Sequence, residues 1–113
     1  MITVDAVRRL ALSLPRTTEH LIRDRVKFRV GQIVYVAFSA DETVMGFAYP
    51  KDEREALIAS APEKFHLPRL SDQRFNWVDA WTSALDEDEM HELVVDAWRM
   101  VFPKSVAAAH LGR

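Results

Sequence analysis

Apolar residues recur at helical spacing near the N-terminus and again near the middle of the chain. Residues 3–14 form an amphipathic stripe, and Thr3 is suited to cap the helix that this stripe predicts. A second helix is predicted over residues 53–61, where Asp52 and Glu55 have the spacing of a capping box. Each helix has one apolar side, as expected of a helix that packs against a protein core.

The longest helical pattern lies near the C-terminus. Residues 86–102 are predicted to form a helix in which Asp86 caps the N-terminus and Glu89 makes the reciprocal contact. Pro103 is expected to end this helix, because proline lacks the backbone N–H that a helix interior requires. The apolar residues that fall on one face of the helix are Met90, Leu93, Val94, Ala97, Trp98, Val101 and Phe102.

Between these helices, runs of β-branched and aromatic residues predict strands. Residues 22–30, 33–38 and 43–49 are separated by short turns and are expected to form an antiparallel meander, whereas residues 16–21 are predicted to be a loop. Two further strands are predicted, over residues 74–82 and, as a shorter segment, over residues 65–67. The order of helix, three strands, helix, two strands and helix predicts an α+β fold with a single sheet packed by helices.

The register of the first hairpin depends on the length of its loop at Gly31-Gln32. A two-residue loop places Val34, Val36 and Phe38 on the same side of the hairpin as its basic residues. A three-residue loop places them on the apolar side, because a shift of one residue reverses the direction of every side chain. The three-residue loop separates charged from apolar side chains better and is the favoured alternative.

Four basic side chains alternate along the first predicted strand, namely Arg23, Arg25, Lys27 and Arg29. Because side chains in a strand point to alternate faces, all four are expected on one face. Such a face is suited to contact the phosphate backbone of DNA. The competing interpretation is a solvated surface whose charges discourage aggregation by strand pairing.

The composition is that of an ordinary globular protein, which predicts one domain over residues 1–113. Apolar residues make up 49% and charged residues 28% of the chain, and the net charge is −2, so any nucleic-acid binding must come from a local patch. No apolar run is long enough to span a membrane, and the N-terminus lacks the pattern of a signal peptide. We therefore expect a cytoplasmic protein that does not bind membranes.

Motifs of catalysis, metal binding and cofactor binding are missing from the chain. The lack of cysteine excludes thiolate chemistry, and three glycines are too few for a phosphate-binding loop of either common type. His91-Glu92 begins like a zinc-protease motif, but Val95 stands where the second histidine is required. We therefore expect no catalytic residue, no metal site and no cofactor.

The three tryptophans differ in their predicted surroundings. Trp98 lies on the apolar side of the last helix and is predicted to be in the core. Trp77 and Trp81 share strand parity with Asp79, so the pattern leaves the face on which they lie open.

Several segments in order resemble the MmcQ/YjbR family of small bacterial proteins, and the similarity spans about residues 5–106. The matching segments are Ala11-Leu12-Ser13-Leu14-Pro15, Lys27-Phe28-Arg29-Val30-Gly31, Asp52-Glu53-Arg54-Glu55-Ala56-Leu57, Trp77-Val78, Ala97-Trp98 and Pro103-Lys104. The resemblance implies an α+β fold like that of type III secretion chaperones, described as a double-wing DNA-binding motif. It implies no catalytic residue.

The basic stripe and the resemblance together favour a non-enzymatic binding module whose partner is double-stranded DNA. The residues expected to contact DNA are Arg23, Arg25, Lys27, Arg29 and Arg74, with Lys104 as a further candidate. The alternative is a protein-interaction or chaperone-like module, whose contact patch would consist of Val34, Val36 and Phe38. In either case a monomer or a weak homodimer is expected.

Overall fold

The computed structural model describes residues 1–111, which contain three α-helices, six strands and two short 3-10 helices. The helices are α1 (Val4–Ser13), α2 (Arg54–Ser60) and α3 (Glu87–Leu111), and the 3-10 helices are η1 (Leu70–Asp72) and η2 (Thr82–Ala84). The strands are β1 (Thr17–Ile22), β2 (Arg25–Val30), β3 (Ile33–Phe38), β4 (Val44–Ala48), β5 (Phe65–His66) and β6 (Trp77–Trp81). The predicted α+β fold is confirmed.

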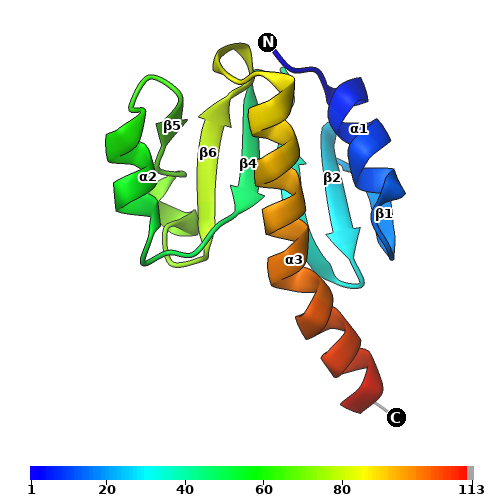
Figure 1. The fold of residues 1–113 in the computed structure, drawn as a ribbon. Coiled ribbons are helices and arrows are strands. Elements are labelled where there is room, and N and C mark those ends of the chain that lie inside the picture. Colours follow the sequence, from blue (N-terminus) through cyan, green and yellow to red (C-terminus); the bar gives the residue numbers. More distant parts are fainter. Residues whose placement is uncertain (112–113) are drawn as a thin grey trace.

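All strands belong to one antiparallel sheet with the order β1-β2-β3-β4-β6-β5. Figure 1 shows α1 and α3 side by side on one face of this sheet, while α2 lies next to β5 near one edge. We refer to the face under α1 and α3 as the covered face and to the opposite face as the open face. Within residues 1–111, none of the helices has the length and apolar character that crossing a bilayer requires.

The core lies between the covered face and the two helices. Phe28 and Val30 of β2 alternate with the basic residues of that strand and are fully buried, as is Phe47 of β4. From the helices, Val7 of α1 and Val94 of α3 pack into the same cluster. Burying apolar side chains of this size contributes roughly 1.5–3 kcal/mol each, so this layer dominates the stability of the fold.

The segment predicted to be a loop before the first hairpin forms the edge strand β1. The first hairpin is therefore β1–β2, with Ile22 paired to Arg25 and a two-residue turn at Arg23-Asp24. Both turn residues have positive φ values, 54° and 63°, as a type I′ turn requires. The prediction of a strand beginning at residue 22 was wrong because this turn lacks the glycine or asparagine that usually marks it.

The register of the β2–β3 hairpin combines features of both predicted alternatives. Its loop has two residues, and Gly31 has a φ of 60°, which suits the first position of a type II′ turn. The favoured three-residue loop was therefore wrong. However, a bulge between Phe28 and Arg29 shifts the strand register by one residue. Val36 therefore pairs with Phe28 and is fully buried on the apolar side, as the three-residue loop would have placed it. Phe38 is buried as well, and Val34 alone of the predicted apolar patch pairs with a basic residue, Arg29.

Two of the predicted helix N-termini are confirmed by their hydrogen bonds. In α1, the Thr3 hydroxyl accepts a hydrogen bond of 3.2 Å from the backbone N–H of Ala6. At α3, Asp86 accepts from the backbone N–H of Glu89 at 2.8 Å, and Glu89 accepts from the backbone N–H of Asp86 at 3.4 Å. These contacts are the two halves of the predicted capping box.

Two other predictions about helix ends were wrong. Helix α2 begins after Glu53 without a side-chain cap, because the N–H of Glu53 donates to the carbonyl of Pro50 and the chain enters the helix from a turn. Helix α3 continues through Pro103 to Leu111. Pro103 is exposed, so water can solvate the carbonyl that its missing N–H leaves without a partner.

Candidate functional site

Three of the four residues of the predicted basic stripe lie together on the open face. Arg25, Lys27 and Arg29 alternate along β2 with core residues, so their side chains point away from α1 and α3. Arg23 is exposed in the β1–β2 turn and does not belong to this row. The structure therefore brings together three strand cations rather than four.

The three cations differ in their partners. Arg29 Nη2 lies 2.8 Å from His20 Nδ1 on the neighbouring strand, and Arg29 Nε is buried without a hydrogen-bond partner. In the part of the chain with described side chains, residues 1–104, no carboxylate forms an ion pair with Arg25, Lys27 or Arg29. Arg25 and Lys27 are therefore available to an anionic ligand, whereas Arg29 is held by its neighbour.

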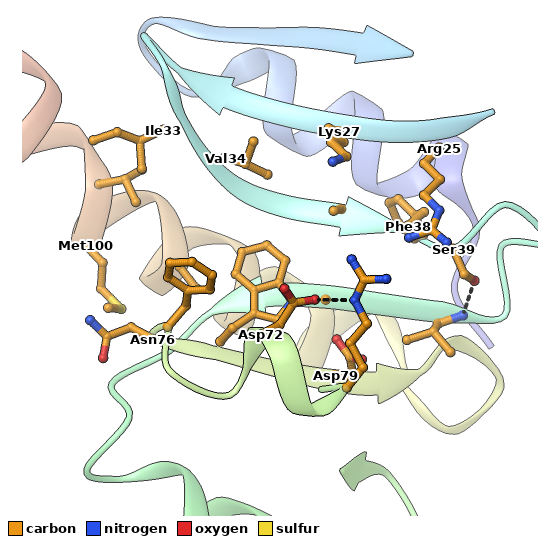
Figure 2. Close-up of a pocket in the computed structure, with 18 of the residues that line it drawn as sticks. Arg25, Lys27, Ile33, Val34, Phe38, Ser39, Asp72, Asn76, Asp79 and Met100 are labelled. Carbon is orange, nitrogen blue, oxygen red and sulfur yellow. Dashed lines mark hydrogen bonds and ion pairs between the residues drawn. The ribbon is translucent and has the colours of Figure 1, made fainter. Parts of the chain in front are cut away.

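A cleft of about 790 Å³ runs along the open face beside Arg25 and Lys27. Arg25 and Lys27 of β2 line one side, Ala37 of β3 and Gly46 of β4 line the middle, and β6 with the loop before it lines the other side. The C-terminal half of α3 also contributes to the lining, through Met100, Val101 and Lys104. Figure 2 shows Arg25 and Lys27 across the cleft from Asp72 and Asp79. Its volume falls in the range of roughly 300–1,000 Å³ that is typical of small-ligand sites.

A single row of paired residues crosses the cleft. Lys27 pairs with Ala37, Ala37 with Gly46, and Gly46 with Asp79. Directly paired residues of antiparallel strands share a face of the sheet. The row therefore has a cation at one end, a carboxylate at the other end and two very small residues between them.

Gly46 allows Trp77 and Asp79 to lie close to β4. A Cβ atom at position 46 would overlap the indole nitrogen of Trp77 and would lie 2.8 Å from Asp79 Oδ1. Burial raises the pKa of the Asp79 carboxyl above its ordinary value, and nearby Asp72 adds to this. The positive charge of His66 and a hydrogen bond from Trp77 act in the opposite direction.

The loop before β6 is held in place by a buried arginine of α2. The Arg54 guanidinium donates hydrogen bonds to the backbone carbonyls of Gln73 at 2.7 Å, Phe75 at 3.1 Å and Trp77 at 3.4 Å. Only 9% of Arg54 is exposed. One side chain thus fixes the wall of the cleft that lies opposite the basic strand.

Two further arginines lie on this loop. Arg69 forms an ion pair with Asp72, with 2.9 Å between Nε and Oδ2. Arg74, which was predicted to be a strand residue, lies before β6, and its guanidinium carbon is 4.8 Å from the ring centre of the exposed Phe75. Since Phe75 lines the cleft, Arg74 lies beside the wall opposite β2.

The charged residues that line the cleft are mainly cationic. They comprise four cations and two carboxylates, namely Arg25, Lys27, Arg69, Lys104, Asp72 and Asp79. Within residues 1–111, no group of three or more histidine and carboxylate side chains is arranged to hold a metal ion. The arrangement suits an anionic ligand that also carries a planar group and hydrogen-bond donors.

Sequence reasoning identified the basic side of the cleft and missed its middle and its far side. Asp79 between two tryptophans and Gly46 within a run of β-formers were the available signals, because glycine in a strand often marks the close approach of another group. Neither signal could be interpreted without the order of the strands. Ala37 gave no signal at all, since alanine is common on any surface.

The fold has a counterpart among solved structures. It is similar to the crystal structure of Deinococcus radiodurans protein DR2400, described as a DUF419 domain, with a TM-score of 0.82 over 99% of this chain and 89% of that chain. The two chains are 19% identical, so this similarity concerns the fold. No curated protein matches the chain. The family model named YjbR matches residues 12–100, and the chain therefore belongs to the MmcQ/YjbR family.

Proposed function

We propose that this protein binds nucleic acid through the basic side of the open face, with Arg25 and Lys27 contacting backbone phosphates. The observation that carries the proposal is that both side chains leave the same strand on the same face and that neither is paired with a carboxylate among residues 1–104. Cations in such a position gain more from a phosphate than cations that already have an acidic partner.

The other predicted contact residues have secondary roles in this proposal. Arg29 holds its position next to His20 and supports the positive potential of β2 without reaching far from the sheet. Arg74 contributes charge from the opposite side of the cleft, and Arg23 from the turn at the end of β2. Because the net charge of the whole chain is −2, binding depends on these local positions and should be sensitive to salt.

The test is a fluorescence-anisotropy titration of labelled duplex DNA at 50 and 200 mM salt. Each phosphate contact adds about −0.9 to the slope of log K against log salt, so Arg25 and Lys27 together account for about −1.8. We expect the variant R25A/K27A to bind at least about tenfold more weakly at 50 mM salt and to have a correspondingly smaller slope.

The matched control is R9A/R99A, which removes the same charge from exposed positions on α1 and α3, on the other side of the sheet. This control should bind nearly as well as the unchanged protein. Failure of both duplex and single-stranded DNA to bind at 50 mM salt, or equal weakening in both double variants, would reject the proposal.

A further inference from the structure

The cleft differs from a flat basic surface because its two sides have different chemistry. The β2 side presents Arg25 and Lys27, while the β6 side presents the carboxylate of Asp79 beside the indole of Trp77. A phosphate cannot bind favourably next to Asp79. A ligand that fits both sides must therefore be anionic at one end and carry hydrogen-bond donors at the other.

The dimensions of the cleft match a single unpaired nucleotide. Lys27 and Asp79 lie at the ends of a row that spans three inter-strand spacings, about 14 Å in total. The small side chain of Ala37 leaves room next to Lys27, whereas the Trp77 indole and the Asp79 carboxylate lie over Gly46 and form the floor of the far half. A base pair inside a duplex cannot enter such a cleft, because its bases are stacked on their neighbours and its phosphates lie outside.

The far side of the cleft offers what an unpaired base requires. Trp77 and Phe75 provide aromatic surface, and Phe75 is 51% exposed. Stacking of a base on an aromatic side chain is a common basis of single-strand recognition. The carboxylate of Asp79 can accept a hydrogen bond from the exocyclic amino group of a base.

On the basis of the proposed function, we infer that the cleft binds one unpaired nucleobase, with its phosphate toward Arg25 and Lys27 and its base toward Trp77 and Asp79. Single-stranded nucleic acid is then the preferred ligand over a duplex. Cytosine, which carries an amino group, is preferred over thymine, because the N–H of thymine is flanked by two carbonyl oxygens that the Asp79 carboxylate repels.

The test compares labelled 12-nucleotide single strands of cytosine or thymine with a mixed-sequence 12-base-pair duplex at 50 mM salt. We expect the cytosine strand to bind at least about tenfold more tightly than the duplex and several-fold more tightly than the thymine strand. Equal affinity for the cytosine strand and the duplex would overturn the inference.

Two variants locate the base. A37L fills the middle of the cleft and should weaken single-strand binding about tenfold or more while leaving duplex binding within about twofold. Its control, A59L, makes the same substitution at exposed Ala59 of α2, outside the cleft, and should bind like the unchanged protein. The near-isosteric variant D79N should reduce the preference for cytosine over thymine. This test does not require A37L to fold, so it still decides the inference if A37L is unstable.

The two proposals fail in different ways. If A37L and D79N leave single-strand binding and base preference unchanged while R25A/K27A weakens binding, the inference about the base is overturned and the phosphate-binding surface stands. If R25A/K27A binds single strands and duplex as well as R9A/R99A does, the proposed function is rejected and the inference falls with it.

Discussion

The two faces of the sheet are built from the same strands but are organised in different ways. On the covered face, Phe28, Val36 and Phe47 are fully buried in an apolar layer under α1 and α3. On the open face, their neighbours in sequence include Lys27, Ala37 and Gly46, which are charged or very small.

The difference indicates which face is optimised for stability. Alanine and glycine are poor strand residues, and larger β-branched residues at the same positions would stabilise a sheet better. Ala37 and Gly46, on the adjoining strands β3 and β4, leave room for a ligand beside Ala37 and for the Trp77 indole over Gly46, at a cost in stability. Violations of local preference of this kind are expected at binding sites rather than in a core.

The largest effect that separates the two faces is expected for adjacent residues of β2. Phe28→Ala removes a fully buried ring and should lower the free energy of unfolding by about 3–5 kcal/mol. Lys27→Ala, one residue away on the open face, should change it by no more than about 0.5 kcal/mol. Urea unfolding of both variants measures the difference. A loss above about 1 kcal/mol for Lys27→Ala would show that the open face also carries stability.

The next largest effect concerns the loop that forms the far side of the cleft. Arg54→Ala leaves three backbone carbonyls, including that of Gln73, without their charged donor and should cost about 2–3 kcal/mol. Arg54→Lys retains the charge but not the planar fork, and should recover only part of this loss. Urea unfolding gives both values. Full recovery with lysine would mean that the charge alone holds the loop.

The covered face could be predicted from the sequence, because burial leaves a periodic pattern of apolar residues. The stripe of α3, its capping box and the alternation of Phe28 and Val30 along β2 are all local signals, and the structure confirms them. The strand β1 escaped prediction because Thr17–Ile22 is a half-exposed edge strand with little apolar alternation.

The cleft could be predicted only on the side that belongs to one strand. Its other parts come from positions that are far apart in the chain, such as Ala37, Gly46 and Asp79, and they become neighbours through the strand order. The crossing from β4 to β6 passes through α2 and the loop held by Arg54. No local pattern specifies that Arg54 donates to carbonyls about twenty residues later in the chain, because backbone carbonyls are present in every sequence.

A smaller effect is expected at Gly46, where the Trp77 side chain packs closely on β4. Gly46→Ala places a methyl group against the Trp77 indole and should cost about 1–3 kcal/mol. In a background that already carries Trp77→Ala, the same substitution should cost much less. A double-mutant cycle from urea unfolding isolates this coupling. A coupling energy near zero would contradict the close packing of Trp77 on β4.

The smallest effect, and the one that compares two carboxylates directly, depends on pH. The pKa of Asp79 is raised, mainly by burial, so the folded state holds this proton more tightly than the unfolded state. Ionisation of this carboxyl therefore lowers the free energy of unfolding as pH rises from below its unfolded pKa to above its folded pKa. Relative to the unchanged protein, Asp79→Asn should gain stability as pH rises from about 3 to 7.

Asp41 in the β3–β4 turn is the matched control, because its pKa is lowered by hydrogen bonds from Ser39 and Thr43. Its ionised form adds stability above the unfolded pKa, and this is lost as pH falls through the folded pKa, so Asp41→Asn should lose relative stability as pH rises. Thermal unfolding at several pH values measures both variants against the unchanged protein, so that contributions from all other groups, including the charged neighbours His66 and Asp72, largely cancel. Slopes of the same sign for the two variants would contradict the burial of Asp79 beside Trp77, and the close packing of these two side chains on β4 would then no longer explain the glycine at position 46.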